Sequence, residues 1–157
     1  MTIRVFGDEI LCLDEKQECF ISCRNSSLIM DLEELLAKID TYRHCDYILL
    51  YRKNNVLHVF LVEIKCVSLR DILRTIVDIG FSEKYRYCKM IGEYVVKGLY
   101  SVIRDNVLET RYYAVIVLRD VYGKHTLLKI HKWFASMGLR LCILVNGDNP
   151  LRCLKQS

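Results

Sequence analysis

Two apolar runs separated by a pair of asparagines constrain the fold of this 157-residue chain more than any other feature. The runs are Tyr47–Lys53 and Val56–Lys65, and both have the residue pattern of β-strands. Asn54-Asn55 fits the two-residue turn of a tight hairpin, because asparagine tolerates the positive φ that such a turn requires. The hairpin is mostly apolar along its length, so we expect both of its faces to be buried.

The turn determines which residues of the two strands face each other. Counting outwards from the asparagines places Asp46 directly opposite Glu63. Such neighbours have Cβ atoms about 4.5–5.5 Å apart and point to the same side of the sheet. Strand periodicity places Lys65 on that side as well. Two carboxylates at the end of a buried hairpin repel each other unless a positive charge lies between them, and this arrangement suggests a metal ion.

Two elements are expected before this hairpin. Residues 3–13 and 18–24 alternate loosely between apolar and polar side chains, which predicts an N-terminal hairpin. Ser26 or Ser27 then offers a helix cap. The apolar stripe that begins at Leu28 predicts an amphipathic helix to about Asp40.

Helices and strands alternate after the central hairpin. The stretch from Ser68 to Asp71 resembles a capping box and opens a helix, which we expect Gly80 to interrupt. The elements predicted next are a helix over Ser82–Arg104, a strand over Tyr112–Leu118, a loop at Gly123, a helix over Leu127–Met137 closed by Gly138, and a strand over Leu139–Val145. A strand, a helix and a strand in this order imply a parallel crossover at this end of the sheet.

This order of elements predicts an α/β fold with a mixed β-sheet flanked by helices. The length favours a single domain over residues 1–157, with a hairpin extension over 1–25, a core over 26–145 and a tail over 146–157. Apolar residues make up 52% of the chain, which excludes disorder as its main state. No apolar run reaches the ~20 residues that a membrane helix needs, so we expect no membrane partner.

Eight cysteines are spread along the chain without a Cys-x-x-Cys pair, which argues against a zinc ribbon or finger. Acidic residues close to the first methionine argue against a secretory signal, and we expect a cytoplasmic (intracellular) protein. Buried reduced thiols are then the simplest interpretation. The alternative is internal disulfides, as in intracellular proteins of hyperthermophiles, and Cys12 and Cys19 could face each other across the first hairpin.

Asp46, followed by Glu63-Ile64-Lys65 at the end of an apolar strand and then by a helix, resembles the PD-(D/E)xK nuclease superfamily. This group includes many restriction endonucleases and archaeal Holliday-junction resolvases. The resemblance covers residues 28–118 and implies a restriction-endonuclease-like core. Cys45 stands where the family's name has a proline. Residues 41–45 are too short for the strand that usually precedes the Asp strand, and the N-terminal hairpin could replace it.

The resemblance implies a metal-dependent nuclease that hydrolyses phosphodiester bonds in DNA. Asp46 and Glu63 would bind Mg²⁺ (or Mn²⁺), helped by the carbonyl of Ile64. Lys65 would orient or help to deprotonate the attacking water and would offset charge on the phosphate. The superfamily often adds an acidic residue from its first helix, and Glu33 is our candidate because it flanks the apolar stripe.

Basic residues on the helices after the motif are candidates for phosphate contacts. Arg70 and Arg74 lie one helical turn apart and nearest to the motif, so we assign them to the nucleic-acid backbone. Tyr85, Tyr87 and Tyr94 could stack on bases, although such residues are also typical of an ordinary amphipathic helix. A net charge of +4 permits DNA as a partner, and a homodimer is a second one, since such enzymes often cleave both strands as dimers.

Two other functions remain open from the same residues. The chain could be a catalytically inactive nucleic-acid-binding protein on the same fold. It could also be an assembly protein whose charged strand ends are merely solvated.

Overall fold

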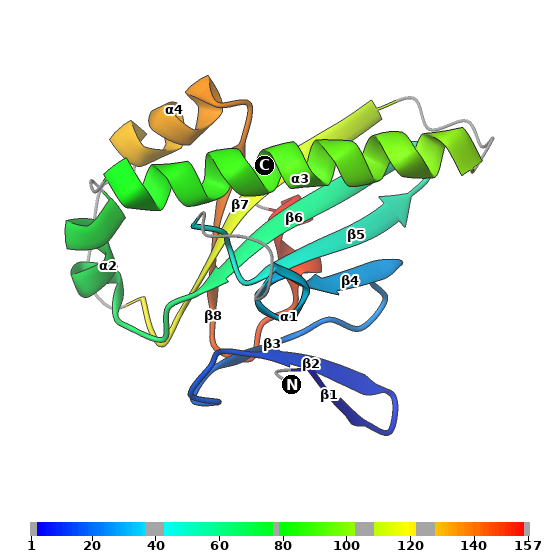
Figure 1. The fold of residues 1–157 in the computed structure, drawn as a ribbon. Coiled ribbons are helices and arrows are strands. Elements are labelled where there is room, and N and C mark those ends of the chain that lie inside the picture. Colours follow the sequence, from blue (N-terminus) through cyan, green and yellow to red (C-terminus); the bar gives the residue numbers. More distant parts are fainter. Residues whose placement is uncertain (1–2, 37–42, 77–78, 103–108, 122–127, 156–157) are drawn as a thin grey trace.

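The computed structural model describes residues 3–36, 43–76, 79–102, 109–121 and 128–155, and it has the mixed α/β class predicted (Figure 1). The strands are β1 (Ile3–Phe6), β2 (Glu9–Leu13), β3 (Phe20–Ser22), β4 (Leu28–Asp31), β5 (Tyr47–Lys53), β6 (Val56–Ile64), β7 (Glu109–Leu118) and β8 (Arg140–Val145). The helices are α1 (Leu32–Leu36), α2 (Leu69–Ile76), α3 (Ile79–Val102), α4 (Leu128–Ser136) and the 3₁₀ helix η1 (Pro150–Lys155).

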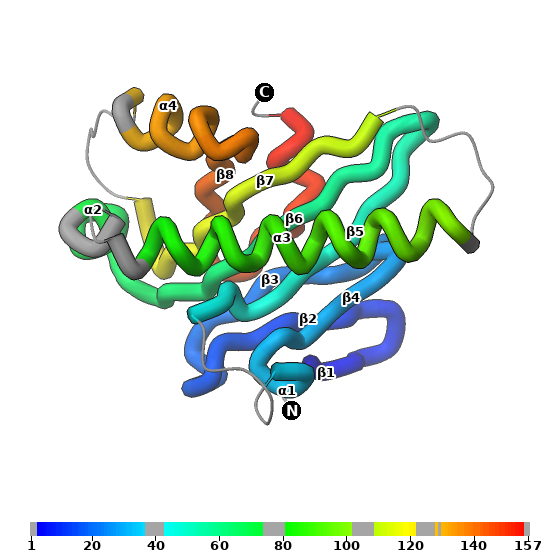
Figure 2. Tube along the Cα trace, turned by 45° about the horizontal axis from the view of Figure 1, so that its top comes forward, coloured from blue at the N-terminus to red at the C-terminus, as the bar shows by residue number. Residues whose placement is uncertain are grey.

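A five-stranded mixed sheet in the order β4-β5-β6-β7-β8 forms the centre of the molecule. Helix α3 crosses one face of this sheet, and the separate antiparallel sheet β1-β2-β3 lies on the other side (Figures 1 and 2). Side chains alternate between the two faces along the strands. Leu61 contributes to the core beneath the helices, whereas Phe60 contributes to the core shared with the N-terminal sheet. The prediction that the central hairpin is buried on both faces is therefore confirmed.

The β5–β6 hairpin has the predicted turn and register. Asn54 has a φ of 55°, in the left-handed region that asparagine tolerates. Lys53 pairs with Val56, and the antiparallel ladder continues without a break to Tyr47 opposite Val62. These pairs confirm the predicted register from the turn to Tyr47. It could be predicted because the register depends on the local chemistry of the turn.

The second half of the chain also follows the prediction closely. The Ser68 hydroxyl accepts a hydrogen bond from the Asp71 N–H (3.3 Å) and donates to Asp71 Oδ2 (3.0 Å), so the capping box opens α2. β6, β7 and β8 are parallel neighbours, as the crossover at this end requires. The two predicted helices are present as α2 and α3, but Gly80 lies inside α3, which begins at Ile79, so the predicted position of the interruption was wrong. The predicted loop at Gly123 lies outside the described residues.

The segment that begins at Leu28 differs from the prediction. Leu28–Asp31 is strand β4 and pairs antiparallel with β5, whereas the helix starts only at Leu32. A short apolar run fits either period, and pairing with the free edge of β5 decided for the strand. β4 lies beside the Asp strand but precedes α1 in the chain, and the N-terminal strands form a sheet of their own, so the predicted replacement by the N-terminal hairpin was wrong. The end of the predicted helix, residues 37–40, lies outside the described residues.

The N-terminal segment contains three strands where two were expected. A turn at Gly7, with a φ of 57°, divides the first predicted strand into β1 and β2. β3 then pairs with β2, so that Cys12 lies opposite Ile21 and not opposite Cys19. The predicted extension over 1–25 contains this sheet, and the predicted tail contains η1.

Six of the eight cysteines form disulfides, Cys12–Cys23, Cys19–Cys66 and Cys142–Cys153. The expectation of reduced thiols was therefore wrong for these six, and it holds for the buried pair Cys45 and Cys88. The proposed Cys12–Cys19 bond was wrong as well, because Cys12 pairs with Cys23 directly after β3, whereas Cys19 pairs with Cys66 directly after the end of β6. None of the described helices has the length and apolar content needed to cross a membrane.

Candidate functional site

The β5–β6 hairpin brings Asp46 and Glu63 to the same side of the sheet, at the end where β6 finishes. The Asp46 N–H donates to the carbonyl of Val62 over 2.8 Å, and Val62 is the residue paired with Tyr47, so the pairing shifts by one residue directly before Tyr47. The Ile64 N–H donates to Asp46 Oδ2 over 2.7 Å, which fixes this carboxylate against β6. The backbone of β6 therefore holds the Asp46 carboxylate in place.

Glu63 is a buried carboxylate with uneven surroundings. Its side chain is 4% exposed, and its Oε1 atom lies 3.1 Å from Lys65 Nζ and 2.9 Å from Lys84 Nζ. Its Oε2 atom is buried and has no hydrogen-bond partner among the described residues. A charged oxygen in the protein interior is costly unless a hydrogen bond or an ion compensates it. Oε2 is therefore the atom of this site best suited to accept a cation.

Asp46 has an unusual proton affinity because of this environment. Burial, and secondly the charge of Glu63, raise the pKa of Asp46 from its ordinary value of 3.8 to about 7. The Ile64 N–H and the two lysines oppose this rise without cancelling it. Two neighbouring carboxylates resist joint ionisation, and a divalent cation between them would remove that penalty. The electrostatics of the pair thus fit a cation site.

Lys84 is a site residue that the sequence reasoning did not assign. It lies near the start of α3, and its ammonium donates to Glu63 Oε1 from the helix side. Burial is the largest single effect and lowers the pKa of Lys84, but the charge and hydrogen bond of Glu63, together with the charge of Asp46, outweigh it and raise that pKa above its ordinary value. Helical periodicity could have indicated that Lys84 faces the sheet. Lys84 lies three residues after Phe81 and four residues before Cys88, and both of these residues are buried on the inner face of α3.

Acidic residues of the β4–α1 corner lie on the rim of the same site. Glu33 lines the cleft, but its side chain is 60% exposed and its Oε2 lies 3.8 Å from His44 Nε2. Asp31, which the sequence reasoning did not assign, also lines the cleft and is buried. It accepts a hydrogen bond from the Glu34 N–H at the start of α1 (3.2 Å). The structure therefore offers two acids of this corner as additional ligands, Glu33 from the helix and Asp31 from the strand end.

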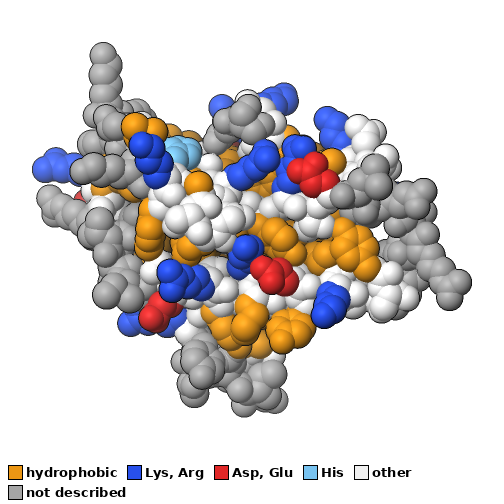
Figure 3. Space-filling view, turned by 90° about the horizontal axis from the view of Figure 1, so that it is seen from above, with side chains coloured by type: hydrophobic (Ala, Val, Ile, Leu, Met, Phe, Trp, Pro, Cys, Tyr) orange, Lys and Arg blue, Asp and Glu red, His pale blue; other side chains and the backbone are white. Residues whose placement is uncertain are grey.

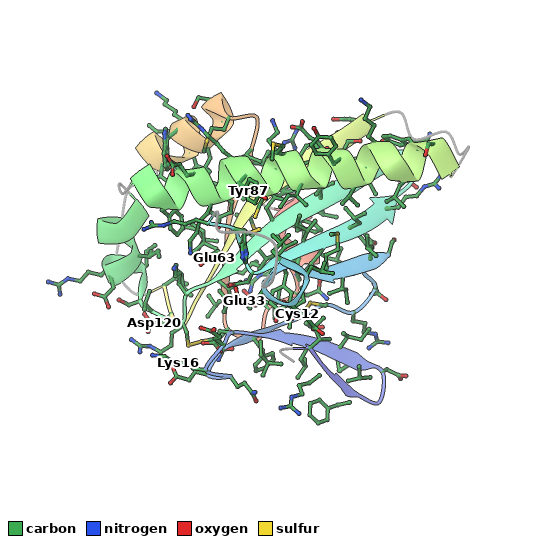
Figure 4. The ribbon with its side chains drawn as sticks, in the orientation of Figure 1. Cys12, Lys16, Glu33, Glu63, Tyr87 and Asp120 are labelled. Carbon is green, nitrogen blue, oxygen red and sulfur yellow. A yellow bond between two sulfur atoms is a disulfide. The ribbon has the colours of Figure 1, made fainter. Side chains whose placement is uncertain are left out.

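These side chains surround a cleft of about 670 Å³. Glu63 lies beneath α3, Glu33 is on α1, and Lys16 lies nearer the N-terminal sheet (Figure 4). Among the described residues, the cleft is lined by seven carboxylate residues and four lysines or arginines. Its excess of negative charge contrasts with the net charge of +4 of the whole chain. This composition attracts cations first, and a phosphate could approach only with metal ions bound.

Of the two basic residues predicted to bind nucleic acid, Arg70 is absent from the described wall of the cleft. Arg70 is exposed on α2, and the side chain of Arg74 lies outside the described residues. The face that carries α3 and α4 mixes lysines and arginines with hydrophobic side chains (Figure 3). Tyr94 is exposed there, whereas Tyr85 is buried and donates its hydroxyl to the Val115 carbonyl (2.9 Å), so Tyr85 is unable to stack on a base.

Comparison of the chain with protein-family models, with curated proteins and with solved structures finds no match. The interpretation of the site therefore depends on its own geometry and chemistry.

Proposed function

We propose that this protein is a metal-dependent nuclease of the PD-(D/E)xK type, with a restriction-endonuclease-like core, that hydrolyses phosphodiester bonds in DNA. The observation that carries the proposal is the buried, unpartnered Oε2 of Glu63 next to Asp46, a carboxylate whose pKa is raised to about 7. Carboxylate oxygens are the ligands that Mg²⁺ and Mn²⁺ prefer in proteins, so the donor set fits the expected cofactor.

In this proposal Asp46 and Glu63 hold the metal ion, with the Ile64 carbonyl as a third candidate ligand. When bound, the ion supplies Lewis-acid polarisation of the phosphate and activation of the attacking water. The Lys65 side chain is 29% exposed, so its ammonium can meet a phosphate or a water in the cleft while it contacts Glu63 Oε1. Lys65 then orients or helps to deprotonate the water and offsets charge on the phosphate.

Lys84 acts in this proposal as a positioning residue. It occupies Glu63 Oε1 together with Lys65 and leaves Oε2 for the ligand. Glu33 remains the candidate acid from α1, and Arg70 and Arg74 remain candidates for contacts to the DNA backbone.

Of the inactive alternatives on the same fold, nucleic-acid binding and assembly, the negative excess of the cleft favours an assembly protein. A polyanion meets seven carboxylate residues among the described cleft residues and only four lysines or arginines. Without bound metal ions this surface repels a phosphate backbone.

Cleavage assays with linear and branched DNA separate these functions. The parent protein is incubated with Mg²⁺ or Mn²⁺ beside the variants Asp46→Asn, Glu63→Gln and Lys65→Ala. We expect cleavage by the parent and a loss of about 100-fold or more in each variant, the scale of a lost acid–base or ligand group. Glu34→Gln is the matched control. Glu34 is an exposed acid next to Glu33, and its substitution removes one negative charge, as Glu63→Gln does.

No cleavage by the parent, or undiminished cleavage in all three variants, would overturn the nuclease proposal. DNA binding without cleavage would favour the inactive binding protein, and neither binding nor cleavage would favour the assembly protein. Sedimentation of the free and DNA-bound protein tests the proposed homodimer.

A further inference from the structure

The Cys19–Cys66 disulfide joins the N-terminal sheet to the residue that directly follows Lys65. Cys66 lines the cleft and is partly exposed. The four cysteines of the other two disulfides are at most 2% exposed. Thiol–disulfide exchange requires access to a sulfur atom. A reductant that enters the cleft therefore reaches this disulfide before the others.

On the side of the N-terminal sheet, the disulfide holds an acidic turn formed by residues 14–18. The Asp14 carboxylate accepts hydrogen bonds from the N–H groups of Glu18 (2.7 Å) and Cys19 (3.1 Å). The Asp14 N–H in turn donates to the Cys19 carbonyl over 3.1 Å. The turn is thus fastened to Cys19 and moves with it.

The same turn is held against the motif strand. One ligand atom each from Asp14, Glu18 and Cys66 lie within 4.8 Å of one another. We assign no metal to this group, because the Cys66 sulfur is bonded to Cys19. Cys66 has a φ of 47°, in the region that side chains rarely adopt, so its backbone needs support from its surroundings. The bond to Cys19 provides a covalent support at this position.

The turn sets much of the charge of the cleft. Asp14, Glu15 and Glu18 are three of the seven carboxylate residues in the described wall, and Lys16 is one of its four cationic residues. Charges that lie within the screening length of about 8–10 Å of a ligand at physiological ionic strength act on it together. With the turn in place the cleft attracts divalent cations and opposes a phosphate polyanion.

We infer that the Cys19–Cys66 disulfide is a redox-sensitive clamp that holds the acidic turn in the wall of the cleft and thereby raises the affinity of the cleft for divalent cations. This inference rests on the proposed function, whose metal site it regulates. A dithiol reductant opens the clamp. One of its thiolates attacks Cys66 Sγ, and Cys19 leaves as a thiolate and takes up a proton. The second thiol of the reductant then releases Cys66 as a thiol and closes the reductant's own disulfide.

The order of reduction is the first test. The native protein is titrated with dithiothreitol, free thiols are alkylated, and disulfide-linked peptides are identified by mass spectrometry without reduction. We expect Cys19–Cys66 to open first, at reductant concentrations that leave the other two disulfides intact. A native protein without this bond, or one in which a fully buried disulfide opens first or together with it, overturns the clamp.

Hydrogen exchange and Mn²⁺ binding test what the clamp holds. We compare the parent with Cys19→Ser/Cys66→Ser and with the control Cys142→Ser/Cys153→Ser. The first variant should exchange amides of residues 14–20 about tenfold faster or more and bind Mn²⁺ about threefold to tenfold more weakly. The control should leave both unchanged. The partly reduced parent provides the same readouts if the first variant does not fold.

The variant Glu15→Gln/Glu18→Gln separates charge from movement, because it removes two charges of the turn and leaves the disulfide intact. We expect it to weaken Mn²⁺ binding to a similar degree without faster exchange of residues 14–20. Unchanged exchange after opening of Cys19–Cys66 overturns the clamp. Absence of Mn²⁺ binding by the parent in both redox states overturns the proposed metal site, and the clamp is then decided by the mapping and exchange results.

Discussion

The substitution Asp46→Asn should stabilise the metal-free protein at alkaline pH, although it removes a proposed catalytic group. The folded protein raises the pKa of Asp46 from 3.8 to about 7. A raised folded-state pKa means that the stabilising contribution of the protonated acid is fully present below pH 3.8 and is lost as the pH rises through about 7. Asparagine has the size of aspartate, carries no charge, and keeps an oxygen that can accept the Ile64 N–H.

The magnitude follows from the pKa shift. One pKa unit corresponds to about 1.4 kcal/mol, so the shift is equivalent to about 4 kcal/mol over the whole titration. Roughly 3 kcal/mol of this is lost between pH 5 and pH 8. We therefore expect the stability of Asp46→Asn, relative to the parent, to increase by about 2–3 kcal/mol between these two pH values.

Urea denaturation in EDTA at pH 5 and pH 8, with the disulfides intact, measures this difference. Glu34→Gln removes an exposed charge of α1 and should change the stability by less than about 0.5 kcal/mol at either pH. Saturating Mg²⁺ at pH 8 should raise the denaturation midpoint of the parent and not that of Asp46→Asn. Parallel pH dependences of the parent and Asp46→Asn would refute the assignment of a destabilising, buried carboxylate pair.

Three further substitutions test other parts of the structure by denaturation. Lys84→Met should lower the free energy of unfolding by about 2–4 kcal/mol, because it leaves the buried Glu63 with one cation fewer. Adding Glu63→Gln to this variant should restore part of that free energy, and fully additive effects of the two substitutions would contradict the coupling. Replacing both cysteines of Cys19–Cys66 by serine should cost about 4 kcal/mol, against about 3 kcal/mol for either disulfide of sequence separation 11, because its separation of 47 closes a longer loop. An equal or reversed order would contradict the loop-entropy argument. Tyr47→Phe removes a hydrogen bond of 2.6 Å to the carbonyl of residue 13 and should cost about 1 kcal/mol, and an unchanged stability would mean that water replaces the hydroxyl.

Local chemistry explains why much of the fold could be predicted. The central hairpin and its register follow from Asn54-Asn55, a turn whose backbone requirement can be recognised in two residues. The capping box at Ser68 and the apolar periodicities of α3 and β7 are equally local. Because a hairpin register determines which residues share a face, the local turn was enough to predict that Asp46 and Glu63 meet at one end of the hairpin, and both residues line the cleft there.

Contacts between distant segments decided the remainder. Leu28–Asp31 fits a helix or a strand by its own pattern, and the free edge of β5 made it a strand. Cys19 and Cys66 are 47 residues apart, and only the packing of one sheet against the other brings them together. Lys84 reaches Glu63 because α3 crosses the sheet at that position. The amino-acid sequence thus determined the pair of carboxylates, whose spacing depends on one turn, whereas the tertiary structure decided their charge environment, which depends on elements that meet only in three dimensions.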